Sequence, residues 1–430
     1  MRHARTRNAA VVAAVAATLA LTSCSSEEPA ADEPTMTEEM PDDAASQDMA
    51  ETSALMPMGT GDPFADARTA AAHMPETALT LATGLATATG TEGEVDSAAA
   101  DLRAGLTALL QEHVYLAGTA VATAYTTGPD SDEFALAAEA LDGNSVDLST
   151  AIGELAGDEA EADFLALWRE HVGFFVDYAV AQQAGDAEAR DAALASLQGY
   201  TTDAGAFFEE ISAGELPAAA IAESLEMHIT TLTAAIDGLA AGDTGAYASL
   251  QEAASHVGMA AETIAGGLDT ALDLDGDPSD PASTLRSDMT YLLQEHVYLA
   301  AISVFTAYTA EGGPESEAFT AAAGVLDENS VALSEAVTSL AGDENGAAFL
   351  DLWREHIGYF VDYAVARAGG DEQGTQDALR NLDGYRPQAG DFFEEVSGGE
   401  LPSDAVAEGL THHVETLAGA IDSLSAALVE

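Results

Sequence analysis

The sequence predicts an all-α protein made of two tandem homologous helical bundles, each built from repeated helical hairpins. The first observation is an internal repeat, because LLQEHVYLA at residues 109–117 recurs unchanged at residues 292–300. The second is the spacing of apolar residues, which from residue 63 onward fits one face of a helix. The third is that no segment there alternates apolar and polar residues as a strand would.

We interpret residues 1–23 as a signal peptide, because three arginines precede an apolar run at residues 9–21. The following LTSC motif at residues 21–24 resembles the lipobox of bacterial lipoproteins. This resemblance implies cleavage before Cys24 and lipidation of that residue, which would anchor the protein to the extracytoplasmic face of the cell membrane. Cys24 is the only cysteine, so an intrachain disulfide and a cysteine-based zinc site are excluded.

Residues 24–62 are predicted to form a disordered acidic tether between the lipid and the helical part. The segment is rich in Pro, Ser, Ala, Asp and Glu, and it lacks an apolar period. It also contains five of the ten methionines. Thioethers can bind soft metals such as Cu(I), and the alternative is a simple solvated spacer.

The charge balance excludes one large class of partners. The chain has 75 acidic residues against 12 basic ones, for a net charge of −63. Such a surface repels nucleic acid, so we expect no nucleic-acid binding. A protein or glycan of the cell envelope remains possible as a partner, in addition to the membrane reached through the lipid anchor.

The helical part is predicted to divide into bundle 1 at residues 63–241 and bundle 2 at residues 242–430. In bundle 1, long helices are expected around His113, His171 and His228. Each of these histidines lies within the apolar stripe of its helix, which predicts that all three are buried.

Between the long helices we predict interrupted ones, each with a helix breaker near its middle. Asn144 and Tyr200 follow two of these breakers, and we interpret them as neighbours of helix caps. The four segments are residues 65–79, 139–152, 195–208 and 251–264, with the breakers Pro75, Gly143, Gly199 and Gly258 respectively.

The histidines follow the duplication, because every one except His3 and His412 has an equivalent in the other copy. Helical bundles build metal and haem sites from inward side chains on facing helices, and imidazole suits Cu, Zn and Fe. We therefore predict one buried histidine layer per bundle that binds a transition metal, with haem as the second choice of cofactor. The predicted ligands are His73, His113, His171 and His228 in bundle 1, and His256, His296, His356 and His413 in bundle 2.

A metal-free alternative stays open, in which the histidines only form hydrogen bonds in the core. The protein would then be a structural or interaction module of the cell envelope. The two alternatives predict different geometries. Ligand nitrogens must converge to within about 4–5 Å of one another, whereas core histidines would be scattered, each beside a carboxylate or a backbone carbonyl.

The sequence does not predict an enzyme. Motifs of nucleophilic hydrolases, phosphate loops and dinucleotide-binding turns are absent, as are HExxH, CxxCH and the Glu-x-x-His spacing of di-iron bundles. Glu112 and Glu295 each precede a histidine of the predicted layers, and we expect each to contact a neighbouring helix, because adjacent helical residues point about 100° apart.

The motif pair LLxEHVxLA and LWREHIGxFVDYA resembles an uncharacterised group of exported bacterial proteins. The resemblance covers residues 102–239 and 285–428. It implies an exported all-helical module. Some members of that group carry a copper amine oxidase label, but the Asn-Tyr-Asp/Glu sequence that amine oxidases convert into their cofactor is absent here. We therefore expect no oxidase activity.

Overall fold

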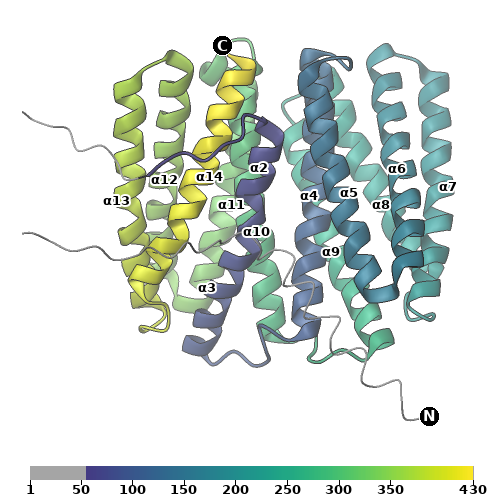
Figure 1. The fold of residues 1–430 in the computed structure, drawn as a ribbon, viewed down its shortest axis with the longest axis horizontal. Coiled ribbons are helices and arrows are strands. Elements are labelled where there is room, and N and C mark those ends of the chain that lie inside the picture. The colour runs from purple at the N-terminus through teal and green to yellow at the C-terminus, as the bar shows by residue number, and fades with distance from the viewer. Residues whose placement is uncertain (1–54, 430) are drawn as a thin grey trace, which may run out of the picture.

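The computed structural model describes residues 55–429, and in this range the chain is helical without a single strand (Figure 1). This confirms the predicted all-α fold. The predicted signal peptide, Cys24 and residues 24–54 of the predicted tether lie outside the described residues. Within the described range, no helix combines the length and the apolar character that a membrane span requires.

Six helices of the described chain close into a ring, which we call the first ring. Each helix packs against the next one along the chain, and the last packs against the first. The helices are α4 (Ala98–Thr127), α5 (Asp132–Ala156), α6 (Asp158–Ala184), α7 (Ala187–Ile211), α8 (Ala218–Ala241) and α9 (Ala246–Leu272).

The second ring repeats this arrangement, but its closing helix comes from the start of the chain. Helices α2 (Pro63–Ala72) and α3 (Met74–Thr89) follow one another end to end and fill the place that α9 has in the first ring, with α2 against α14 and α3 against α10. The other members are α10 (Pro281–Thr309), the short 3-10 helix η2 (Gly313–Glu315), α11 (Glu317–Ala341), α12 (Asp343–Gly369), α13 (Glu372–Val396) and α14 (Ser403–Leu428).

The two copies of the repeat therefore exchange their first helices. Helices α2 and α3 belong to the first copy and pack in the second ring, whereas α9 belongs to the second copy and packs in the first ring. The predicted division at residues 241/242 does not match this packing, and it assigned α2, α3 and α9 to the wrong bundles. The physical reason is that similarity between the copies shows which helices are equivalent, but does not show which neighbour each one contacts.

The exchange is held at two connections, residues 90–97 and 273–280, which lie between the rings. Arg103 on α4 donates a hydrogen bond to the carbonyl of Pro278 at 2.7 Å. Its equivalent on α10, Arg286, donates to the carbonyl of Val95 at 2.8 Å. Each arginine thus binds the connection of the opposite copy, and both side chains are buried. Helices α4 and α10 also pack directly against each other.

Side-chain caps define where many of these helices begin. Ser97, Ser131 and Ser316 each accept a hydrogen bond from the backbone three residues further on, at the starts of α4, α5 and α11. Such caps satisfy one of the free N–H groups in the first helical turn. The sequence therefore encodes the helix starts locally, before any contact between helices is made.

The predicted interruptions are wrong for three of the four helices. Helices α5, α7 and α9 run unbroken through Gly143, Gly199 and Gly258. A glycine inside a helix costs only about 1 kcal/mol relative to alanine, and packing of the helix offsets that cost. Of the four predicted breakers only Pro75 coincides with a break, where α2 ends and α3 begins, and its missing N–H leaves the preceding turn without one hydrogen bond.

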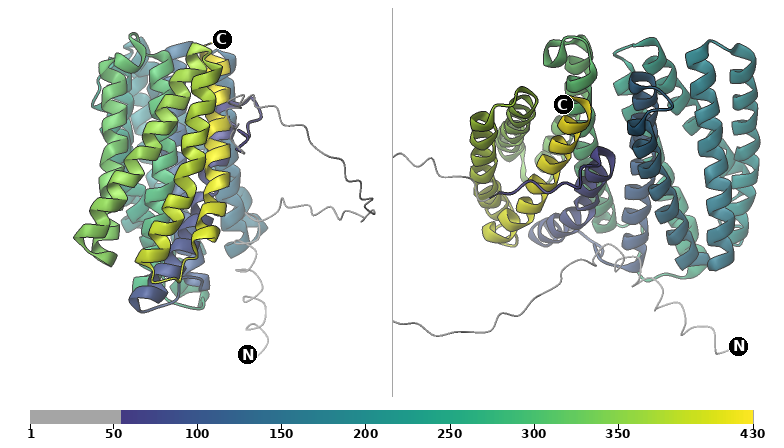
Figure 2. Two further views of the ribbon diagram at one scale, coloured as in Figure 1. Left: turned by 90° about the vertical axis from the view of Figure 1, so that its left-hand side faces the viewer. Right: turned by 45° about the horizontal axis from the view of Figure 1, so that its top comes forward.

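Residues 55–62 are not part of a tether, contrary to the prediction, because they pack along α14 (Figure 2, right). The amide of Met58 donates to the carbonyl of Glu415 at 2.8 Å, and the side chain of Leu55 is buried. Gly419 permits this contact, because a Cβ there would lie 1.9 Å from the carbonyl oxygen of Met58. The buried carboxylate of Asp66 then accepts the amide of Thr60 at 2.9 Å.

Candidate metal centres

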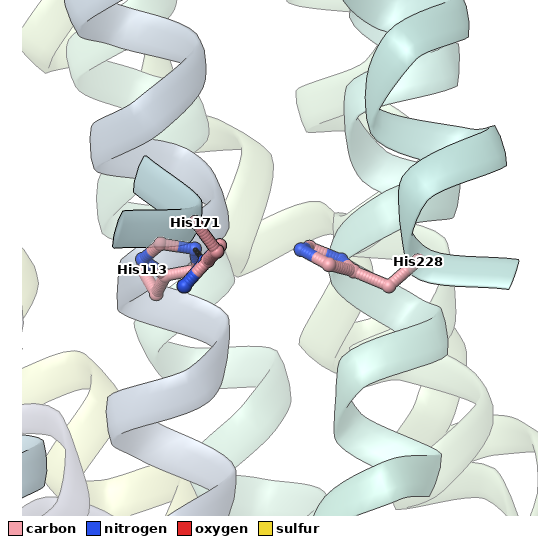
Figure 3. Close-up of side chains that lie close together, drawn as sticks. All are labelled: His113, His171 and His228. Carbon is pink, nitrogen blue, oxygen red and sulfur yellow. Dashed lines mark hydrogen bonds between the residues drawn. The ribbon is translucent and has the colours of Figure 1, made fainter. Parts of the chain in front are cut away.

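Three buried histidines converge inside the first ring. His113 lies on α4, His171 on α6 and His228 on α8, and Figure 3 shows their rings pointing toward one another. Each offers one ring nitrogen, and these nitrogens all lie within 4.8 Å of one another. The Nε2 atoms of His113 and His171 are 3.3 Å apart. The three side chains are exposed by 2%, 1% and 6%, so the cluster is enclosed by protein.

The second ring contains the same cluster. His296 on α10, His356 on α12 and His413 on α14 also offer nitrogens within 4.8 Å of one another. The Nε2 atoms of His296 and His356 are again 3.3 Å apart. Both triads are therefore close enough to hold a metal ion, as predicted, although with three histidines each in place of four.

The alternation of helices around each ring brings the triads together. Helices α4, α6 and α8 contact one another across the interior of the first ring, in addition to their sequential neighbours. The histidine of each helix lies in the apolar stripe that faces this interior, between residues such as Leu110 and Ala120 on α4. Each of these three helices thus places one imidazole in the interior of the ring, where the three imidazoles lie close together.

Aromatic side chains enclose the imidazoles. In the first ring, Trp168 contacts the rings of both His113 and His171, with centroids 4.8 and 4.4 Å away. Tyr200, from α7, stacks on His171 at 4.7 Å. Phe175 meets His228 edge to face at 5.6 Å. The equivalent residues of the second ring, Trp353, Tyr385 and Phe360, make the same contacts.

The interpretation of Tyr200 and Asn144 as neighbours of helix caps is wrong. Both residues lie inside continuous helices and are buried. Tyr200 forms part of the wall around the triad, and Asn144 donates to the carbonyl of Leu109 at 2.9 Å. The signal in the sequence was the recurrence of the same residues as Asn329 and Tyr385 in the second copy.

Burial keeps the triad histidines uncharged. Together with the nearby His228 it lowers the pKa of His113 to about 3. Burial likewise lowers the pKa of His228 to about 4 and that of His171 well below its ordinary value. In the second ring the same cause lowers the pKa of His356 to about 3 and that of His413 to about 4. At neutral pH each imidazole therefore retains a free lone pair, as a metal ligand must.

The hydrogen bonds of the triads do not fit a purely structural role. Nδ1 is buried and has no hydrogen-bond partner in the described part of the chain in His113, His228, His296 and His413, whereas His171 and His356 each have a backbone hydrogen bond, to Trp168 and Trp353. Histidines retained only to support the core would each be paired with a carboxylate or a carbonyl, because an unpaired buried polar group costs about 1–3 kcal/mol. The convergence of the rings on one point is the geometry expected of ligands.

His73 and His256 are not members of the triads. His73 lies between α2 and α3, so the helix exchange places it in the second ring, where its ring centroid is 3.7 Å from that of His412. His256 lies on α9 in the first ring, with Nε2 at 2.9 Å from the carbonyl oxygen of Ser224. The prediction that His73 joins His113, and that His256 joins His296, is therefore wrong. It also omitted His412, for which adjacency to His413 was the only signal.

Each triad lies between two mostly apolar cavities of its ring. In the first ring their volumes are about 70 and 260 Å³, and His113 lines both. In the second ring they are about 480 and 270 Å³, and His296 lines both. An ion bound by three imidazoles would thus have free space beside it for a further small ligand.

The glutamates that precede the histidines point away from the triads, as predicted. Glu112 on α4 forms an ion pair with Arg68 on α2. Glu295 on α10 accepts hydrogen bonds from Tyr115 on α4 at 2.8 Å and from Asn329 on α11 at 2.8 Å. Burial raises the pKa of Glu295. Each of these carboxylates binds a residue of the opposite ring and not the imidazoles. Each triad therefore offers only neutral nitrogen donors.

The geometry suits a single metal ion in each ring. Within the first triad, ring centroids are 5.2 to 6.5 Å apart, so the three imidazoles lie close together. Three protein ligands leave at least one coordination position open. Comparisons with models of protein families, with curated proteins and with solved structures found no match to this chain.

Proposed function

We propose that this protein binds one transition-metal ion in each ring. The ligands are His113, His171 and His228 in the first ring, and their equivalents His296, His356 and His413 in the second. The single observation that carries the proposal is the convergence of three buried ring nitrogens to within 4.8 Å, which occurs twice. The same arrangement of histidines occurs in both copies of the repeat. This supports a metal-binding function that was duplicated together with the fold.

The donor set limits the choice of metal. Neutral imidazoles without thiolate or carboxylate partners suit Cu, Zn or Fe, and they do not suit Ca²⁺ or Mg²⁺, which prefer oxygen ligands. Burying a charged ion in apolar surroundings costs free energy, and the cost rises with the charge of the ion. The environment of the triads therefore favours an ion of low charge. Haem is disfavoured, because the three rings face a common point.

The cavities of the first ring favour binding over catalysis. In the first ring, apart from the histidines themselves, no charged side chain lines either cavity among the described residues. Apart from the histidines, two of which would hold the ion, the titratable groups of these linings are Tyr200 and Tyr125, and burial raises the pKa of both, which makes them poor acid–base groups at neutral pH. We therefore propose a role in holding or carrying the ion, with the open coordination position available for release or exchange.

The proposed location is the outer face of the cell membrane. The LTSC motif and Cys24 support lipid attachment there, and the strongly acidic composition supports attraction of cations to the surface. An extracytoplasmic metal-binding lipoprotein would collect ions from the exterior. A protein or glycan of the cell envelope that binds the acidic surface is the partner we propose.

The test is elemental analysis together with a visible spectrum of the mature protein, purified without a His-tag. The triad variant His171→Gln/His356→Gln is prepared in parallel, and His256→Gln serves as a control that removes a histidine outside the triads. We expect the wild type and the control to carry two equivalents of Cu, Zn or Fe that the triad variant lacks.

A different outcome would establish the metal-free alternative. In that case the wild-type protein is isolated without metal and takes up neither Cu²⁺, Zn²⁺ nor Fe²⁺ on titration, while the triad variant melts at a lower temperature. The histidines would then be structural, and the acidic surface would become the place to search for a partner in the cell envelope.

A further inference from the structure

The larger cavity of the second ring differs from its counterpart in the first ring. Every residue that lines the smaller cavity has its equivalent in the lining of the larger one, yet the volumes are about 70 and 480 Å³. Two of the equivalent positions differ in a way that matters for chemistry. Gly409 replaces Ser224, and His412 replaces Met227.

In the first ring the histidine beside the cavity is already engaged. Nε2 of His256 lies 2.9 Å from the carbonyl oxygen of Ser224. Met227, at the position equivalent to His412, is 52% exposed and does not line the cavity. This side of the first triad therefore offers no pair of imidazoles outside the triad itself.

In the second ring two imidazoles meet at this place without a hydrogen bond between them. The rings of His73 and His412 are in contact, with centroids 3.7 Å apart. Nε2 of His73 is buried and has no partner in the described part of the chain. The two histidines reach this place from different parts of the fold, because His73 occupies the break between α2 and α3, whereas His412 lies on α14.

We propose that His73 and His412 form a second metal site, specific to the second ring, which takes a transition-metal ion such as Cu²⁺ or Zn²⁺. Both side chains are half-buried, whereas the triad is fully buried. They line the same cavity as His296 and His413, so the site is an outer one that shares its cavity with the inner triad.

Two carboxylates support cation binding at this place. Glu76 and Asp288 line the same cavity, and their negative charge attracts cations to it. Each belongs to a helix of the second ring, α3 and α10 respectively. The counterpart cavity of the first ring has no acidic residue in its lining among the described residues. The second ring therefore has an imidazole pair and two carboxylates in the lining of this cavity, whereas the described lining of the first-ring cavity has one histidine outside the triad and no carboxylate.

The test uses the full-length mature protein and titration with Cu²⁺ alone, repeated with Zn²⁺ alone. Bound metal is measured by calorimetry and by elemental analysis after desalting. The key variant is His412→Met, which installs the residue that the first ring has at this position. Met227→Leu in the first ring is the matched control, and His296→Gln/His356→Gln removes the inner triad of the second ring.

We expect His412→Met to bind one equivalent fewer than the wild type, while Met227→Leu binds the same amount. His296→Gln/His356→Gln should retain the outer equivalent, because His73 and His412 are unchanged in that variant. Equal stoichiometry and affinity in the wild type and in His412→Met would overturn the proposal. Equal melting temperatures of the metal-free proteins will show that a loss of metal is not a loss of folding.

The outer site does not depend on the proposed function of the triads, and the variants separate the two. Binding that is lost in His412→Met but is retained in His296→Gln/His356→Gln supports the outer site even if the triads hold no metal. Binding that is unchanged in His412→Met but decreases in His296→Gln/His356→Gln refutes the outer site and leaves the proposed function of the triads supported.

Discussion

Tyr115 and Tyr298, which are equivalent residues of the two copies, stack on each other between the two rings with centroids 5.5 Å apart and planes 15° from parallel. Both are almost fully buried. Such contact between equivalent residues is expected on a pseudo-twofold axis, as in a symmetric dimer. Because the copies also exchange their first helices across this axis, the rings are joined more firmly than two bundles linked only by a loop.

The exchange predicts that a cut between α8 and α9 will not separate the rings. A protease site placed at residues 242–245 would divide the chain into one piece with α2 to α8 and another with α9 to α14. Each piece supplies a closing helix to the ring of the other. We expect the cut protein to elute as one species in size-exclusion chromatography and to separate only in denaturant. Separation under native conditions would contradict the exchanged arrangement.

The Arg68–Glu112 ion pair predicts a selective loss of stability. In the second copy the position of Arg68 is held by Gln251, so Arg68→Gln gives the first copy the residue of the second. Glu112 is buried, and removing its partner leaves a charge without compensation. We expect a loss of about 2–3 kcal/mol in the free energy of unfolding at pH 7, measured by urea denaturation. Burial raises the pKa of Glu112, so the loss should shrink as the pH falls and the carboxylate takes up a proton.

Arg169→Gln provides the control for this prediction. Arg169 binds Asp142 at 2.7 Å, but both side chains are about half exposed. Exposed ion pairs contribute about 0–1 kcal/mol, so this variant should stay close to the wild type. If the two arginine variants lost equal stability, burial of the Glu112 carboxylate would not be the cause.

Two glycines of α14 predict opposite effects of the same substitution. A Cβ at Gly409 would meet no atom within 4 Å, so Gly409→Ala should stabilise the helix by about 0.5–1 kcal/mol. A Cβ at Gly419 would lie 1.9 Å from the carbonyl oxygen of Met58. Gly419→Ala should therefore cost about 1–3 kcal/mol and detach residues 55–62 from α14. Thermal denaturation and limited proteolysis of these residues will measure both effects.

The triads predict loss of stability of the metal-free protein in mild acid. The pKa of His113 is about 3 in the folded protein and ordinarily 6.5, so between these values the unfolded chain binds more protons. The contribution of this histidine is fully present above pH 6.5 and is lost as the pH falls toward 3. We expect a loss on the order of 1–2 kcal/mol from His113 between pH 7 and pH 5.

Comparison with His171→Gln/His356→Gln isolates the same effect at His171 and His356, because burial also lowers the pKa of these two histidines. Burial raises the pKa of Glu295, so its contribution is present at low pH and is lost as the pH rises above its ordinary value. This carboxyl is retained in His171→Gln/His356→Gln, and its effect cancels in the difference. The difference in unfolding free energy between wild type and variant, followed by urea denaturation, should decrease from pH 7 to pH 4. A difference that is independent of pH would contradict neutral buried histidines.

Much of the candidate site was predictable from the sequence, because its signals are local. The position of His113, His171 and His228 in apolar stripes predicted their burial, and the same pattern predicted that of the second triad. What remained open was the number of ligands. Nothing in the spacing distinguished His73 from the triad histidines, because its place depends on contacts made by α2 and α3 across the molecule.

The sequence by itself determined the all-α fold, the duplication and the inward face of each helix that bears a triad histidine. These properties follow from helical periodicity and from capping residues such as Ser97, which act within a few residues of the chain. Only the tertiary structure decided which ring α9 joins, which ring α2 and α3 join, and that His73 meets His412. The physical reason is that duplication produces two similar docking grooves, so the choice between them depends on long-range contacts such as those of Arg103 and Arg286 with the opposite connections.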